Sequence, residues 1–200
     1  MKSALLFLLL LLALPSHAER VPYKGNSSRF NYDKTNEAKE VSSFWEQRKV
    51  AVGVLAGGAY GVLGGTLALH FHPQWSVDMG YGGGTHFQSY GMRVKRLLLT
   101  SSPLNPYLAV GFSRWQRGNS RPFNSKDVSP GFVGDKFMSP ADRENFRIDE
   151  RLIHGALGLQ YVFTDGALVG YGIALEALLL IDSEDFLTVP TASLGLNYFF

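Results

Sequence analysis

The chain has 200 residues, enough for one domain, and its formal net charge is only +2. This charge gives no electrostatic basis for binding nucleic acid, and the absence of cysteine excludes disulfides, thiolate metal sites and lipid attachment at a cysteine. Glycine and aromatic residues are frequent, yet no long apolar segment follows the first residues. This composition is unsuited to a helical membrane protein but fits a membrane β-barrel, whose apolar residues occupy alternate positions.

Residues 1–18 have the features of a secretory signal peptide. Lys2 supplies a positive charge, Leu5–Leu14 is the apolar run, and Ser16 and Ala18 are the small residues before the cleavage site. The run is shorter than the roughly 20 residues of a transmembrane helix. We therefore expect an exported protein, with a retained N-terminal anchor as the alternative.

Residues 19–48 form a polar segment rich in Ser, Asn, Lys and Glu. Only Asn36–Gln47 has helical character, and it carries Phe44 and Trp45 near its end. We expect a flexible periplasmic segment that leads into the domain. A plug inside the barrel, or a segment that binds a partner, is the alternative.

From residue 49 onward the apolar residues recur with period two, which indicates strands with two different faces. Most of the predicted strands reach the roughly 9–11 residues that a tilted transmembrane strand needs. The sequence therefore predicts an all-β domain over 49–200, an antiparallel up-and-down transmembrane barrel of about eight strands. The predicted strands are 49–60, 62–72, 75–83, 85–98, 106–117, 149–164, 167–181 and 187–200.

The connections favour one orientation of this barrel. If the first strand starts in the periplasm, three short connections face the periplasm, at Pro73-Gln74, Thr100–Asn105 and Thr164–Gly166. The long polar stretch 118–148 then lies outside. Short periplasmic turns and longer outer loops are typical of transmembrane barrels.

The last predicted strand ends on an alternating segment. Tyr198 and Phe200 share an apolar face, expected to contact lipid, whereas Ser193 and Gly195 share the other face. These four residues resemble the C-terminal insertion signal of bacterial outer-membrane proteins. The resemblance implies recognition by the barrel-assembly machinery during insertion.

Region 49–200 as a whole resembles the small eight-stranded barrels of the outer-membrane protein A transmembrane type. The resemblance implies a bacterial outer-membrane location, surrounding lipid and lipopolysaccharide as partners, and a monomer. A β-sandwich is the alternative fold, but its outer faces would be polar, whereas the apolar face here is large and aromatic near its ends.

The inward face of the predicted barrel is polar. Arg or Lys facing lipid near the midplane costs about 2–4 kcal/mol, which favours inward positions for Arg93 and Lys95. Buried charges need partners, and Asp78 on the neighbouring strand is the natural one. His72 is expected to face inward as well. The predicted interior core comprises Asp78, Arg93, Lys95, His70, His154, Gln160 and Glu176.

Three functions fit this architecture. An eight-stranded barrel is barely wide enough for its own side chains, so we expect a structural or surface-interaction protein without an open pore. A narrow channel is the first alternative. A lipid A-modifying enzyme is the second, but the histidines are scattered and no His–Ser pair shares a strand face, so no catalytic residue, metal site or cofactor is predicted. The loop 118–148 is the expected exposed surface.

Overall fold

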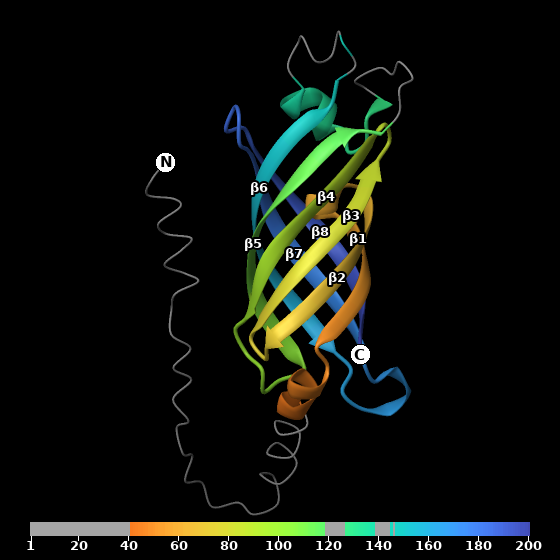
Figure 1. The fold of residues 1–200 in the computed structure, drawn as a ribbon, viewed down its shortest axis with the longest axis vertical. Helices are drawn as coiled ribbons and strands as arrows, with labels where there is room; N and C mark the ends of the chain where they lie inside the picture. The colour runs from red at the N-terminus through yellow and green to blue at the C-terminus, as the bar shows by residue number, and fades with distance from the viewer. Residues whose placement is uncertain (1–40, 119–126, 139–144, 146) are drawn as a thin grey trace, which may run out of the picture.

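The computed structural model describes residues 41–118, 127–138, 145 and 147–200. Its eight antiparallel strands follow one another around a closed barrel, and β1 pairs with β8 (Figure 1). The predicted fold class and strand number are confirmed, whereas residues 1–18 and 19–40 lie outside the described residues. The strands are β1 Val50–Gly57, β2 Leu63–His72, β3 Trp75–Gly84, β4 Phe87–Leu97, β5 Leu104–Arg117, β6 Asp149–Val162, β7 Tyr171–Asp182 and β8 Thr188–Phe199.

The two ends of the barrel differ. We call the end where β1 begins and β8 ends the terminal end; its connections are residues 73–74, 98–103 and 163–170. The opposite end, the loop end, carries the long connection between β5 and β6 (Figure 1). No helix among the described residues is long and apolar enough to span a membrane.

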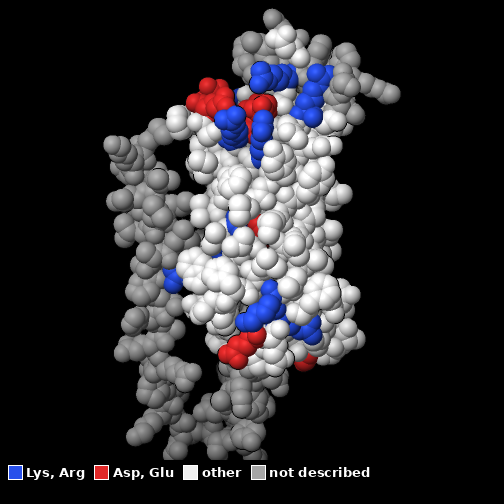
Figure 2. Space-filling view, in the orientation of Figure 1, with Lys and Arg blue, Asp and Glu red and all other residues white. Residues whose placement is uncertain are grey.

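The outer wall of the barrel is apolar over most of its height. On β6, Ile153, Leu157, Leu159 and Tyr161 are exposed, whereas the alternate residues point inward and are buried. From Arg151 to Tyr161, at about 3.3 Å per residue and a tilt of roughly 40°, this wall spans about 25 Å along the axis. That height equals the apolar band of about 25 Å in transmembrane barrels. Figure 2 shows the charged side chains gathered toward the two ends of the molecule.

Two predicted strand limits are wrong, and glycines explain both. The first strand ends at Gly57 because Gly57 and Gly58 adopt positive φ angles of 79° and 85°, which turn the chain into a short 3-10 segment, η1 (Gly58–Tyr60). Tyr60 thereby enters the lumen, where it is 1% exposed. The predicted strand 167–181 begins only at β7 because η4 (Gly166–Leu168) and Gly170 precede it.

The predicted inward orientation of His72 is also wrong. The register between β2 and β3 shifts between His70 and His72, so His72 is exposed although His70 is buried. The Nδ1 atom of His72 accepts a hydrogen bond from the backbone N–H of Gln74 at 3.2 Å. A bulge of this kind breaks strict alternation, which is why period two alone fails here.

Candidate functional site

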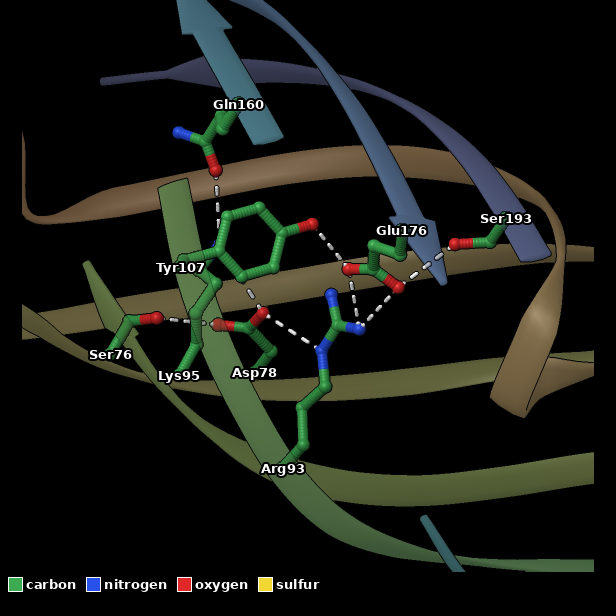
Figure 3. Close-up of polar contacts among 8 residues, drawn as sticks. All are labelled: Ser76, Asp78, Arg93, Lys95, Tyr107, Gln160, Glu176 and Ser193. Atoms are coloured by element: carbon green, nitrogen blue, oxygen red, sulfur yellow. Dashed lines mark hydrogen bonds and ion pairs between the residues drawn. The ribbon is translucent and has the colours of Figure 1, made fainter. Parts of the chain in front are cut away.

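A compact group of four charged side chains fills the middle of the lumen. Arg93 on β4 stands opposite Asp78 on β3, and its Nε donates to Asp78 Oδ2 at 3.1 Å (Figure 3). The Nη1 of Arg93 reaches across the lumen to Glu176 on β7 and donates to Oε2 at 2.9 Å. Lys95 Nζ lies 3.5 Å from Asp78 Oδ2. Two cations therefore face two carboxylates, and the formal charge of the group is zero.

Hydroxyl groups complete the hydrogen bonding of Glu176. Tyr107 donates to Glu176 Oε1 at 2.6 Å, and Ser193 donates to Oε2 at 2.8 Å (Figure 3). Gly158 makes room for this arrangement, because a Cβ atom at that position would overlap the Tyr107 ring. Glu176 thus accepts from a guanidinium and two hydroxyls, which is the environment that an ionised buried carboxylate requires.

Asp78 and Lys95 have neutral partners as well. Ser76 donates to Asp78 Oδ1 at 2.7 Å, and Lys95 Nζ donates to Gln160 Oε1 at 3.2 Å. Ser76, Tyr107 and Ser193 were not among the residues that the sequence predicted for the core, although all three occupy inward positions of alternating strands. We call the eight residues of Figure 3 the ionic core.

The ionic core leaves almost no free space. Arg93 and Lys95 are each 5% exposed, and Asp78 and Glu176 are each 2% exposed. The cavity around them has a volume of about 10 Å³, room for roughly one water molecule. The lumen is therefore filled at this level.

His70 and His154 are buried but lie outside the ionic core. His70, near the terminal end, packs against Trp45 with ring centroids 5.4 Å apart. His154, nearer the loop end, packs against Tyr60 with ring centroids 6.5 Å apart. Neither ring nitrogen of either histidine has a hydrogen-bond partner among the described residues. The two histidines are thus separated, and neither is paired with a serine or an acid.

At the loop end, residues 128–138 fold back over the barrel; we call this segment the lid. Val128, Val133, Phe137 and Met138 of the lid are each at most 2% exposed and share an apolar cluster with Trp115 of β5. The Nε1 of Trp115 donates to the carbonyl of Ala59 at 2.9 Å, and its ring stacks on Phe87. The described part of the long connection is therefore packed on the barrel.

At the terminal end, residues 41–48 close the opening; we call this segment the cork. Residues 41–47 are helical, and Val41, Phe44 and Trp45 are buried in one cluster with Phe199 of β8 (Figure 1, orange). The Trp45 and Phe199 rings meet edge to face at 5.4 Å. Arg48 donates to the carbonyl of Phe199. Residues 41–47 are thus helical and packed on the barrel, where the sequence led us to expect a flexible lead-in, and the role of segment 19–48 stays a prediction.

The four residues of the predicted insertion signal divide between the two faces of β8. Ser193 and Gly195 point inward and are buried, and Ser193 belongs to the ionic core. Phe200 is exposed on the outer wall, with its ring 4.9 Å from that of Tyr198. Their predicted role in insertion stays a prediction.

A charged group marks the upper edge of the outer wall. Arg114 on β5 engages both oxygens of Asp149 on β6, at 2.8 and 3.0 Å. Arg147 lies 3.7 Å from the same carboxylate, and Arg151 stands directly opposite Arg114. Among the described residues, no group of three or more His, Cys, Asp or Glu side chains is placed to hold a metal ion.

Comparison with solved structures identifies the same architecture. The chain is similar to the N-terminal β-barrel domain of Pseudomonas aeruginosa OprF, with 16% identity over 76% of this chain and 98% of that chain, and a TM-score of 0.55. At this identity the similarity shows the fold alone. The predicted resemblance to small eight-stranded outer-membrane barrels is confirmed at that level.

Other barrels are more distant. Neisserial surface protein A and Ail of Yersinia pestis match 76% of this chain and 96% and 99% of theirs, at 11% and 12% identity. Their TM-scores of 0.44 and 0.39 carry no further argument. No protein-family model and no curated protein match the chain.

Proposed function

We propose that this chain is a closed, non-conducting β-barrel of the bacterial outer membrane with a structural or surface-interaction role. The observation that carries the proposal is the filled lumen. The ionic core occupies the middle and leaves a cavity of about 10 Å³, the lid covers the loop end, and the cork covers the terminal end. This arrangement supports a lumen without a continuous water path along the axis.

The outer wall supports placement in a membrane. Its exposed residues are large and apolar, and charged side chains gather at the two ends (Figure 2). The long connection between β5 and β6 lies at the loop end, which supports an orientation with the lid outside and the cork in the periplasm. The lid and the neighbouring turns then form the surface available to an external partner.

The same features weigh against the two alternatives. A channel needs a continuous path, and the buried ion pairs obstruct it. A lipid-modifying enzyme of the His–Ser type needs a histidine hydrogen-bonded to a nucleophile, whereas the buried nitrogens of His70 and His154 have no such partner among the described residues.

Conductance in planar bilayers tests the proposal. Full-length purified protein should give no discrete openings, while a porin of known conductance, reconstituted in the same membranes, serves as the positive control. Steady, reproducible openings would contradict a closed barrel. Lipid A mass spectra of cells with and without the protein address catalysis: identical spectra are expected, and a change in acylation that depends on the protein would contradict a non-enzymatic role.

Lipid and lipopolysaccharide are the proposed surroundings of the outer wall. Arg114 and Arg147 contact the carboxylate of Asp149 at the edge of the apolar band, and Arg151 stands opposite Arg114. The adjoining hollow is also lined by four further acids, Glu150, Asp182, Glu184 and Asp185. Guanidinium groups suit phosphate. Lipopolysaccharide that co-purifies with the protein should decrease in the variant R147Q/R151Q but not in the terminal-end control Lys49→Gln; equal amounts would contradict the contact.

Insertion through the barrel-assembly machinery is proposed for β8. The outward pair Tyr198 and Phe200 lies at the terminal end of this strand, in the pattern of the insertion signal. Phe200→Ala should lower the amount of protein that reaches the outer membrane, compared with the equally exposed Leu194→Ala. Equal amounts would contradict a signal at Phe200.

A further inference from the structure

The cork is an amphipathic helix with one buried side. Val41, Phe44 and Trp45 follow the spacing i, i+3, i+4 and are buried, whereas Glu46 and Gln47 are exposed. The buried side packs on Phe199, whose ring lies 5.7 Å from Phe44 and 5.4 Å from Trp45. The cork is therefore held mainly by aromatic contacts in the mouth of the barrel.

The cork takes no part in the sheet. The strand pairing of β1 begins at Val50, with β2 on one side and, from Ala51, with β8 on the other. The cork contacts β8 through the hydrogen bond from Arg48 to the carbonyl of Phe199, and the Arg48 guanidinium lies 5.2 Å from the centre of the Phe44 ring. Movement of residues 41–48 away from the mouth would break no strand pair.

Several buried polar atoms, one in the cork and the others in the lumen beneath it, lack a hydrogen-bond partner among the described residues. The Nε1 of Trp45, both ring nitrogens of His70, Oδ1 of Asn105 and Nε2 of Gln160 are buried without a hydrogen-bond partner among the described residues. Buried polar atoms without partners are costly, and water would satisfy each of them. The seated cork is therefore stabilised by apolar contacts but destabilised because it keeps polar groups away from bulk water. These two contributions to the free energy of the seated state oppose each other.

We propose that the cork is a displaceable plug at the terminal end of the barrel. It seals a polar vestibule, by which we mean the part of the lumen lined by His70, Asn105 and Gln160. In the seated state the aromatic contacts to Phe199 close the vestibule. In the displaced state water reaches His70, Asn105 and Gln160, while the eight-stranded sheet stays intact. The cork itself, residues 41–48, is the segment that binds at the terminal end of the barrel, over the vestibule.

The vestibule ends at the ionic core. Lys95 and Asp78 form its floor, and their buried ion pair is independent of the cork. Displacement of the cork therefore opens a closed-ended chamber and not a pore. The inference is separate from the proposed lack of conductance, since either can fail while the other holds.

Single cysteines measure this opening directly, because the chain contains no cysteine of its own. Ala68→Cys places a thiol in the buried cluster shared with Trp45 and Phe199, where Ala68 is 8% exposed. Ala156→Cys is the matched control, since Ala156 is 7% exposed but belongs to the apolar cluster beneath the lid. Both full-length proteins are treated with a small water-soluble methanethiosulfonate under conditions in which the barrel stays folded, checked by heat-modifiable mobility.

We expect the thiol of Ala68→Cys to react at least about tenfold faster than that of Ala156→Cys. Adding F44A and W45A should speed the first reaction by at least a further factor of about ten, because two aromatic anchors are lost, and should leave the second unchanged. The exposed substitution Glu46→Ala should change neither rate. Equal slow rates at both positions would overturn the proposal, and so would a rate at Ala68→Cys that is insensitive to the cork substitutions.

Discussion

The barrel is closed at both ends by apolar segments, and each closure buries one tryptophan completely. At the loop end, Trp115 donates its indole N–H to Ala59 at 2.9 Å. At the terminal end, the indole nitrogen of Trp45 has no partner among the described residues. The two buried indoles therefore differ in polar pairing: that of Trp115, in the barrel wall, is hydrogen-bonded within the barrel, whereas that of Trp45, in the cork, is held by apolar and aromatic contacts.

The largest effect is expected at the ionic core, which lies between the two closures. Glu176→Ala leaves Arg93 with Asp78 alone and removes the acceptor of Tyr107 and Ser193, so the free energy of unfolding should fall by about 3–5 kcal/mol. Denaturant titration of the refolded protein measures this change. The exposed turn variant Glu184→Ala should stay within about 0.5 kcal/mol of the unaltered protein; a similar fall in both variants would contradict a dominant ionic core.

The second-largest loss of stability is expected at the loop end. Trp115→Phe keeps the aromatic packing but leaves the carbonyl of Ala59 unpaired in a buried position. The same titration should show a loss of about 1–3 kcal/mol from this carbonyl, in addition to the packing loss of the smaller ring. An unchanged midpoint would show that the hydrogen bond from Trp115 to Ala59 contributes nothing to stability at the loop end.

The smallest effect is expected at the terminal end. Trp45→Phe removes no hydrogen bond, so only the difference in ring volume remains, and the loss should stay under about 1.5 kcal/mol. It should also be smaller than the loss in Trp115→Phe, which serves as its matched comparison. If Trp45→Phe proves the more damaging of the two, the contrast between the ends is wrong.

The strands were predictable because each exposes one face to an apolar surrounding and the other to the lumen. Period two therefore persists along most of the chain, and errors occur where glycines or a bulge break it. Gly57 and Gly58 turn the first strand inward, and the register shift after His70 exposes His72. Neither the inward turn nor the register shift can be predicted from the alternation of apolar residues alone.

The ionic core was predictable only in part. The pair Asp78 and Arg93 follows from a hairpin, because residues on adjacent strands face each other at a spacing that the turn fixes. The contact from Arg93 to Glu176 joins β4 and β7, which are not adjacent, and depends on how the barrel closes. Tyr107 and Ser193 reach Glu176 for the same reason: alternation places both on the inward face but does not show which residue each of them contacts.

The cork illustrates a different limit. Its aromatic residues were visible in the sequence, but their contact, Phe199, lies about 150 positions away at the other end of the chain. A short helical pattern does not reveal which surface it covers. Only the closed barrel brings the two segments together.

The pairing of β1 with β8 has a consequence for biosynthesis. The backbone N–H of Phe200 donates to the carbonyl of Val50 at 2.8 Å, so the earliest strand receives its second neighbour only when the last strand arrives. Until β8 pairs with it, β1 has β2 as its neighbour on one side and an open hydrogen-bonding edge, of the kind that promotes aggregation, on the other. Contacts of such long sequence separation also form slowly. The assembling barrel is thus exposed at β1 until it closes, and an assembly factor that covers this edge would protect it for that interval.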